Sequence, residues 1–296
     1  MNLSETQLQD DSIVQHIDES KRKARSYLLG RQSQSGGFCF YRSTYLDEPN
    51  LSDTWHAVAS LQLLGEAFPK FGLLRNFVCM QPVAKQLYDL YFRTFTLKTL
   101  NCDDPELAEV KKNVRELQLD IQTMSRQGDN SGLLQRLLLI LRLKIFFGAE
   151  FDPEGVAKTI QRLEQPDGGF GISPNVMETR IALDVAELCG LGISKNTTEF
   201  LNRLEGPGYA FKLTEKSLSP NLETVCAGIE CCRKANLPVL YALDAAKFIM
   251  ACQTHNGGFA RAPDALPDLG LTHLALYGLA CLFDDVQFDD VQFQYP

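Results

Sequence analysis

Two kinds of apolar pattern alternate along the chain. In the first kind, apolar residues recur at helical spacing between charged ones, as Val156, Ile160 and Leu163 do. In the second kind a whole segment is apolar, as at 137–141 and 274–280. A helix with one apolar face lies at a surface, whereas a helix that is apolar all round is buried. The alternation therefore predicts pairs of helices, each with an outer and an inner member.

A short motif joins the two helices of a pair and recurs along the chain. Three copies carry a Gln and then Gly-Gly-Phe, and they end at Phe38, Phe170 and Phe259. An apolar helix follows each copy, and in the first two it opens with an acid–Thr step, Asp53–Thr54 or Glu178–Thr179. Three degenerate copies complete the set. We expect one domain over residues 1–296, built from repeats at about 13–65, 73–100, 105–148, 153–192, 196–237 and 239–283.

The repeats predict a closed all-α architecture. A single helical pair cannot bury its apolar face, so neighbouring pairs must stack. Alternating Val, Ile and Thr runs typical of strands are absent. The paired glycines allow a backbone turn that other residues avoid, and the Phe after them is expected to wedge between pairs. We expect an α6–α6 toroid with an inner and an outer ring of helices around an apolar interior.

Composition and charge restrict the partners. The chain has 296 residues, with 29 Lys and Arg against 37 Asp and Glu, so its net charge is −8. This sign argues against nucleic acid, because phosphate binding requires a basic face. The nine Cys residues include no Cys-x-x-Cys pair, which favours reduced, buried thiols over a disulfide or zinc framework.

No membrane-spanning or export segment is evident. Residues 1–19 are polar and acidic, unlike a signal peptide. No apolar run approaches the ~20 residues that a spanning helix needs. We expect a soluble cytoplasmic protein that could still touch a membrane peripherally.

The repeated motif resembles one superfamily. Gln, Gly-Gly-Phe and an acid–Thr step before an apolar helix are similar to the repeats of squalene–hopene and oxidosqualene cyclases, and of protein prenyltransferase β subunits. The resemblance covers about residues 13–283. It implies an α/α-barrel that binds a small-molecule polyprenyl substrate and needs no obligate protein partner.

One stretch looks like the acidic repeat of class II terpene cyclases, which carry Asp-x-Asp-Asp before Thr. Residues 36–54 retain the last Asp of that motif as Asp53. The length of the chain is most similar to single-domain bacterial class II cyclases of meroterpenoid biosynthesis. This resemblance implies an isomerase that closes several rings on a polyprenyl chain through carbocations. The expected substrate is a geranylgeranylated aromatic compound, and no metal or other cofactor is expected.

Two other functions stay open. Protein prenyltransferases bind catalytic zinc with an Asp, a Cys two residues later and a His, and the matching positions here are Glu223, Val225 and Leu271. Two of the three lack a ligating atom. A shifted set of Glu223, Cys226 and His273 can be drawn, since zinc accepts carboxylate, thiolate and imidazole. The alternatives are thus a zinc-dependent prenyltransferase-like β subunit and a non-catalytic isoprenoid-binding barrel.

Class II chemistry needs an acid that stays protonated. A free Asp has a pKa of about 3.9, and burial in apolar surroundings raises it. The candidates are Asp53, one turn from His56, and Asp89, between Tyr88 and Leu90. Asp53 is equally suited to cap a helix, and Arg93 is placed to keep Asp89 ionised. Both acids stay open as proton donors.

Aromatic side chains near the inner helices are candidate substrate-binding residues, because their faces stabilise cations. Core packing is the alternative role for each of them. Arg180 is a candidate partner for a substrate carboxylate or for Glu178. The full candidate set is Phe38, Trp55, His56, Tyr88, Tyr91, Phe92, Phe170, Glu178, Arg180, Phe211, Glu223, Phe259 and Tyr277.

Overall fold

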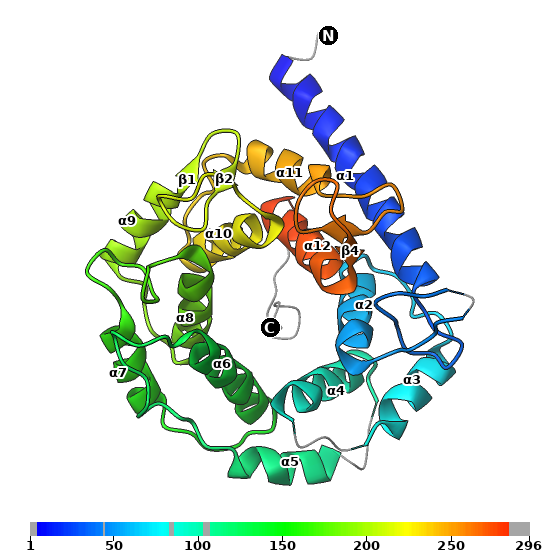
Figure 1. The fold of residues 1–296 in the computed structure, drawn as a ribbon, viewed down its shortest axis with the longest axis horizontal. Coiled ribbons are helices and arrows are strands. Elements are labelled where there is room, and N and C mark those ends of the chain that lie inside the picture. Colours follow the sequence, from blue (N-terminus) through cyan, green and yellow to red (C-terminus); the bar gives the residue numbers. More distant parts are fainter. Residues whose placement is uncertain (1–4, 44, 83–85, 103–106, 284–296) are drawn as a thin grey trace.

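The computed structural model describes residues 5–43, 45–82, 86–102 and 107–283. The inner helices line the centre of the ring, and the outer helices surround them (Figure 1). The inner helices are α2 (Leu51–Leu63), α4 (Leu87–Thr99), α6 (Ser131–Phe146), α8 (Val176–Leu188), α10 (Leu222–Lys234) and α12 (Leu269–Phe283). The outer helices are α1 (Glu5–Gly30), α3 (Phe71–Met80), α5 (Leu107–Glu116), α7 (Pro153–Leu163), α9 (Lys195–Leu204) and α11 (Ala242–Ala251).

The inner helices form a closed circle. Each packs against the next, and α12 returns to pack against α2 (Figure 1). Each outer helix packs on the inner helix that follows it, and α1 also contacts α12. The predicted all-α toroid is therefore confirmed.

Burial follows the two sequence patterns. Outer helix α7 buries Val156, Ile160 and Leu163 on one face. In inner helix α12 every residue from 271 to 280 is buried. The inner helices, which are largely apolar all round, are thus covered by the outer helices and by the neighbouring inner helices, as their sequences predict.

A repeated hydrogen-bond pattern fixes the start of the inner helices. Asn50 caps α2, and its side chain accepts the backbone N–H of Asp53. The Thr54 hydroxyl donates to the Asn50 carbonyl and accepts the backbone N–H of Phe38. Thr179 and Thr272 bind the Phe of their own turns in the same way. The acid–Thr step and the Gly-Gly-Phe turn are therefore one structural unit.

Two short hairpins form in the loops that precede α10 and α12. Strand β1 (Glu205–Gly206) pairs antiparallel with β2 (Ala210–Phe211) before α10. Strand β3 (Phe259–Ala260) pairs antiparallel with β4 (Pro267–Asp268) before α12. Each hairpin brings its chain back to the start of an inner helix.

The last Gly-Gly turn closes the ring onto the first helix. Gly257 has a φ of +94°, and a Cβ on it would clash with the Lys23 carbonyl oxygen of α1. Beside it, the Gln253 amide donates to the carbonyls of Ser20 and Gly257. Gln253 thus hydrogen-bonds to α1, and Gly257 lets the turn pack closely against it.

We expect Gly257→Ala to lower the free energy of unfolding by about 2–4 kcal/mol, because it adds left-handed strain to a backbone clash. Gly132→Ala is the matched control. Gly132 lies in α6 with no other atom near the new Cβ, so alanine should stabilise the protein by about 0.5–1 kcal/mol. Urea unfolding measures both changes. Equal effects of the two substitutions would contradict this account of ring closure.

Candidate functional site

Aromatic rings gather where α2 meets α12 and α4. The Trp55 ring centroid lies 4.7 Å from that of His56 and 5.0 Å from that of His273 in α12. On the other side it lies 6.0 Å from Tyr91 and 5.6 Å from Phe92 in α4. All five side chains are buried. We call Trp55, His56, Tyr91, Phe92 and His273 the aromatic cluster.

The aromatic cluster contains an uncharged histidine. The Nδ1 atoms of His56 and His273 lie 3.4 Å apart, so one ring must donate and the other accept. Burial, together with the neighbouring His273, holds the pKa of His56 well below its usual range. Near neutral pH this imidazole therefore carries no charge.

Charged side chains gather on the opposite half of the inner ring, on α6, α8 and α10. Asp184 lies at the centre, with one oxygen 2.6 Å from Lys234 Nζ. Its other oxygen lies 3.3 Å from an Arg180 nitrogen and 3.5 Å from an Arg142 nitrogen. Arg180 also lies 3.6 Å from the Glu230 carboxylate. We call Arg142, Arg180, Asp184, Glu230 and Lys234 the ionic cluster.

The pKa values of the two acids in the ionic cluster are shifted in opposite directions. Burial disfavours the charge of Asp184, yet Lys234, Arg142 and Arg180 hold its pKa below the usual range. Burial raises the pKa of Glu230, which neighbours Arg180. Neither Glu230 oxygen has a hydrogen-bond partner in the described part of the chain. The ionic cluster thus holds one acid whose charged form is favoured and one whose charged form is disfavoured.

The two clusters are connected. Arg142 Nη1 donates to the Tyr91 hydroxyl at 3.1 Å, which joins the ionic cluster to the aromatic one. A similar hydrogen bond joins α10 to α12, where Arg233 donates to the Tyr277 hydroxyl at 3.2 Å. In Figure 1 the aromatic helices α12, α2 and α4 form one half of the inner ring, and α6, α8 and α10 form the other. The inner ring is thus polarised and not uniformly apolar, which corrects the expected apolar interior.

Asp53 lies in the first turn of α2, two residues before Trp55, and is 8% exposed. The Asn50 amide donates to its carboxylate at 2.5 Å. Burial raises the pKa of Asp53, although hydrogen bonds from Asn50 and the Phe40 backbone oppose the rise. The charge of Asp268 raises it further. Asp53 therefore combines a buried carboxyl group with a bias toward the protonated form.

Asp268 is an acid that the sequence motifs do not single out. It precedes α12 and accepts the backbone N–H of Leu271, in the position that Asn50 has before α2. Burial raises its pKa as well. Two acids with raised pKa values thus mark the starts of α2 and α12.

The other predicted acid has a different setting. Asp89 is half-buried in the first turn of α4, and its neighbour Tyr88 is 48% exposed. Arg93 is buried and donates to the Cys79 carbonyl at 3.3 Å. The interior surroundings expected for a proton donor are thus less complete at Asp89 than at Asp53.

Several predicted binding residues have structural contacts. In the described part of the chain Arg180 forms ion pairs with Asp184 and Glu230, whereas Glu178 is one of the partners expected from the sequence. Glu223 binds Arg261 at 2.7 Å. Burial raises the pKa of Glu178. The four turn phenylalanines are buried in the hydrophobic cores, as expected for wedges: Phe38, Phe170, Phe211 and Phe259.

The shifted zinc set is not assembled. Among residues 5–283, masked segments aside, no group of three or more His, Cys, Asp and Glu side chains is placed to hold a metal ion. Glu223 instead faces Arg261, and His273 faces His56. Burial raises the pKa of the Cys226 thiol well above its usual range. The hypothesis that Glu223, Cys226 and His273 form one site is therefore wrong.

The sequence motifs did not single out Arg142, Asp184, Glu230 or Lys234. A signal was present, because each is a charged residue in a helix that the repeats predict to be an inner one. Arg180 and Asp184 are also four residues apart, as are Glu230 and Lys234, which places each pair on one helix face.

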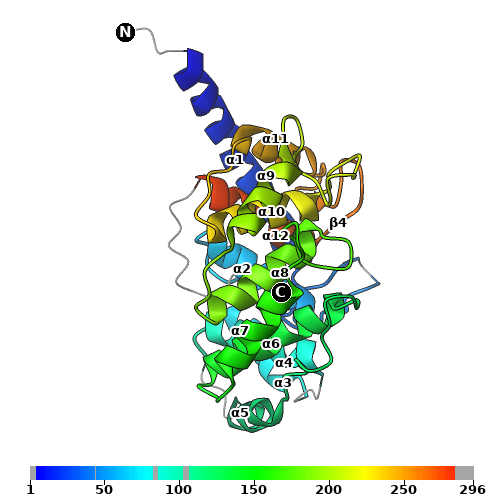
Figure 2. The same ribbon diagram turned by 90° about the vertical axis from the view of Figure 1, so that its left-hand side faces the viewer.

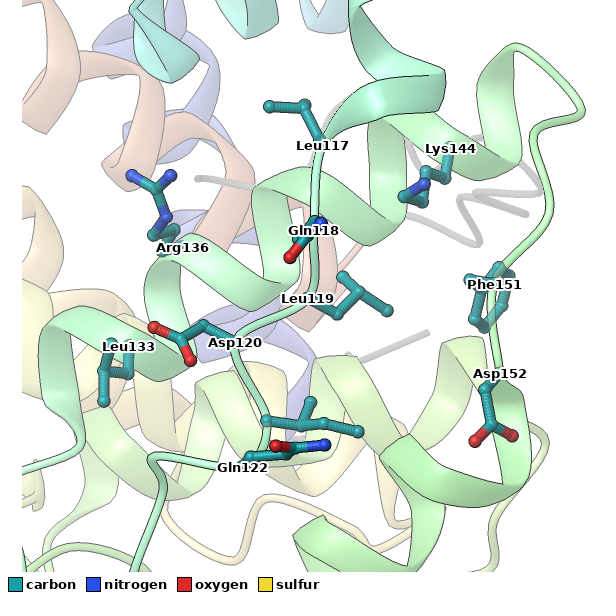
Figure 3. A pocket seen from close by; sticks show the side chains of 11 residues that line it. Leu117, Gln118, Leu119, Asp120, Gln122, Leu133, Arg136, Lys144, Phe151 and Asp152 are labelled. Carbon is teal, nitrogen blue, oxygen red and sulfur yellow. The ribbon is translucent and has the colours of Figure 1, made fainter.

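A surface cavity of about 870 Å³ is lined by segment 117–122, by helix α6 and by the two residues before α7 (Figure 3). Segment 117–122 follows α5, in one of the three repeats without a Gly-Gly-Phe turn. Arg136, Lys144 and Asp152 supply its charged lining. No candidate site residue lines this cavity.

Comparisons with known proteins identify a family model and a fold. The model of the prenyltransferase alpha-alpha toroid domain matches residues 4–83 and 79–292. The structure is similar to Candida albicans protein geranylgeranyltransferase-I complexed with GGPP, with a TM-score of 0.61 and 17% identity. That match covers 78% of this chain and 83% of the other. No curated protein sequence matches the chain significantly. In the described helices, none combines the length and apolarity needed to cross a bilayer.

Proposed function

Because the chain belongs to the prenyltransferase alpha-alpha toroid domain family, we propose that its inner ring binds a polyprenyl chain and cyclises it by protonation. The observation that carries the proposal is the setting of Asp53. A buried carboxyl group with a raised pKa lies two residues before the aromatic cluster. Protonation-initiated cyclisation requires an acid of this kind and an aromatic surface, and α2 carries both.

The proposed reaction is an isomerisation. The Asp53 carboxyl group gives its proton to the terminal alkene carbon, which leaves a tertiary carbocation. Successive alkene π electrons then form carbon–carbon bonds, and the last cation loses a proton from carbon to a base. Solvent returns a proton to the Asp53 carboxylate. Product and substrate therefore have the same composition.

The aromatic cluster suits the cationic intermediates. Aromatic faces stabilise a nearby cation by about 0.5–2 kcal/mol each when water is excluded. The His56 imidazole is uncharged, so it adds no repulsion.

The ionic cluster suits an anionic head group. Two of its members, Arg142 and Arg180, carry guanidinium groups, which bind carboxylates and phosphates well. The Arg142–Tyr91 hydrogen bond places the two clusters next to each other. We therefore expect a substrate with an apolar prenyl chain and an acidic head, such as a geranylgeranylated aromatic acid.

A transferase is the second candidate, favoured by the structural similarity to a protein geranylgeranyltransferase bound to GGPP. A zinc site at the family positions would need ligands at Val225 and Leu271, and neither side chain has a ligating atom. Dependence of turnover on stoichiometric zinc would favour the transferase.

Trp55 is the single tryptophan of the chain, so its fluorescence reports directly on the aromatic cluster. We expect geranylgeranyl diphosphate to change the emission saturably, because a prenyl chain that enters the inner ring alters the surroundings of the indole. Inorganic diphosphate is the control and should leave the emission nearly unchanged. An emission that stays constant up to high prenyl concentration would contradict binding at this cluster.

The proposed reaction is tested by incubating the purified protein with geranylgeranylated aromatic acids and analysing the products by mass spectrometry. We expect a new product with the mass of the substrate and fewer alkene protons in its NMR spectrum. A product in which the prenyl group has moved to an added thiol or peptide would support the transferase. Binding without any product would leave only an isoprenoid-binding barrel.

A further inference from the structure

The chain between α5 and α6 runs along the outside of the ring. Figure 2 shows α5 and α7 as neighbouring outer helices. Near the end of α6, Lys144 Nζ donates to the Arg115 carbonyl at 3.5 Å. Near the end of α7, Arg162 donates to the Met124 carbonyl at 2.9 Å. Segment 117–122 thus extends from the end of α6 to the end of α7, and we call the cavity beside it the flank cavity.

The flank cavity has an apolar wall. Its lining includes five half-buried apolar side chains, which are Leu117, Leu119, Ile121, Leu133 and Phe151. In Figure 3 Leu119 points from segment 117–122 toward Phe151. The cavity volume of about 870 Å³ lies within the range of about 300–1,000 Å³ that is typical of ligand pockets. The apolar chain of a ligand in this cavity would therefore be shielded from water by the wall.

Lys144 brings a buried positive charge to the flank cavity. It lines the cavity, yet the residue is 5% exposed. Its ammonium group donates to the carbonyls of Arg115 and Glu150, at 3.5 Å and 3.3 Å, and both acceptors are neutral backbone groups. An ammonium group has a third N–H donor, and in the described part of the chain no carboxylate pairs with it. A buried charge is costly unless an opposite charge compensates it, so an anionic group in the cavity would stabilise Lys144.

The other charges of the flank cavity lie at its surface. Beside Asp152, a second acid lines the cavity, Asp120, and both acids are exposed, as is Arg136. The Asp152 carboxylate caps α7 by accepting the Gly155 N–H at 2.9 Å. In Figure 3 the Asp120 carboxylate points toward Leu133 and away from Lys144. Two cations and two acids give the lining no net charge, so the burial of Lys144, and not the sum of charges, selects an anion. Water and salt screen exposed charges much more than buried ones.

We propose that the flank cavity binds a long-chain carboxylate, whose carboxylate accepts the third N–H of Lys144 and whose chain lies along Leu119, Ile121 and Phe151. A single remaining N–H donor suits a carboxylate. A phosphate has three strong acceptor oxygens, which would need further donors. The flank cavity lies on the outer side of α6, so this binding is separate from the function proposed for the inner ring.

Calorimetric titration of the full chain with oleate, kept below its micelle concentration, tests the proposal. We expect saturable binding at one site per chain. Oleyl alcohol has the same apolar chain without the carboxylate and should bind at least tenfold more weakly, because it cannot compensate the charge of Lys144. Octanoate has the carboxylate with a much shorter chain and should also bind at least tenfold more weakly, because it buries less of the apolar wall.

Lys144→Gln is the variant that tests the position of the carboxylate. Glutamine removes the charge but keeps a side-chain donor for the two carbonyls, and we expect oleate to bind at least tenfold more weakly. The matched control is Lys98→Gln, because Lys98 is the basic residue in the last turn of α4, as Lys144 is in α6. Lys98 does not line the flank cavity, so this variant should bind oleate like the wild type. The comparison of oleate with oleyl alcohol needs no substitution, so it decides the proposal even if Lys144→Gln fails to fold.

Three results would overturn the proposal. The first is a wild type that does not bind oleate, and the second is equal affinity for oleate and oleyl alcohol. The third is oleate binding that Lys144→Gln leaves unchanged and that alters the emission of Trp55, which would place the ligand in the inner ring. A wild type that binds oleate through Lys144 but converts no prenyl substrate would support this site while contradicting the proposed cyclisation.

Discussion

Replacing Asp184 with Asn is expected to lower the free energy of unfolding by about 3–5 kcal/mol, the cost of breaking a buried ion pair from one side. Asp184 faces Arg142, Arg180 and Lys234, and none of the four side chains is more than 4% exposed. The substitution keeps the shape of the side chain but removes its charge. In this variant Glu230 is the remaining acid of the ionic cluster, beside Arg142, Arg180 and Lys234.

Glu187→Gln is the matched control for this prediction. Glu187 also binds Lys234, at 2.5 Å, but its side chain is about half exposed. Water can replace its carboxylate, so we expect a loss of less than about 1 kcal/mol. Urea unfolding with a two-state analysis measures both variants. Losses of similar size would show that Asp184 is not the centre of the ionic cluster.

The pH dependence of stability has a definite sign at Asp184. Its pKa is lower in the folded protein than in the unfolded chain. Its contribution is therefore present above the unfolded pKa of about 3.9 and is lost as the pH falls through the lower folded value. The gap in stability between wild type and Asp184→Asn should thus be full at pH 7 and should narrow below about pH 4.

The substitution Asp53→Asn is expected to lower kcat by a factor of about 10²–10⁴, the range for removing a general acid. Asparagine preserves the hydrogen bond with Asn50 but has no proton that it can give to carbon. Prenyl binding, measured through Trp55 fluorescence, should change little. The rate of the wild type should fall as the pH rises through the raised pKa of Asp53, because only the protonated carboxyl group reacts.

Asp89→Asn is the control, because Asp89 is the other acid that the sequence allows as a donor. Its half-buried position predicts a change in kcat of less than about tenfold. If Asp89→Asn abolished turnover while Asp53→Asn retained it, the donor would be Asp89. If neither substitution changed turnover, protonation by an inner-helix acid of the first two repeats would be excluded.

The ring architecture could be predicted from the sequence because its determinants are local and repeated. The 3.6-residue periodicity separates outer helices from inner ones, and Gly257 marks a turn whose backbone has no room for a side chain. The Thr at the start of an inner helix is likewise explained by one short hydrogen bond, as in Thr54 with Phe38. Each of these features lies within a single repeat or recurs in several.

The ionic cluster could not be predicted with its partners, because it joins side chains from three different repeats. Arg142, Asp184 and Lys234 lie on α6, α8 and α10, and no single repeat shows that they meet. Apolar residues surround them in the sequence, which favours the interpretation that these helices only pack in the hydrophobic core. Asp268 was missed for a related reason, since its effect on Asp53 arises only where the first and last repeats close the ring.

Isotope incorporation during turnover in D₂O tests the central claim most directly. If a carboxylic acid of the inner ring protonates carbon, the acid exchanges with solvent and the cyclised product gains a carbon-bound deuterium at the terminal position, seen by mass spectrometry and NMR. Asp53→Asn should give no labelled product. A product that forms at the wild-type rate without carbon-bound deuterium would contradict protonation as the first step.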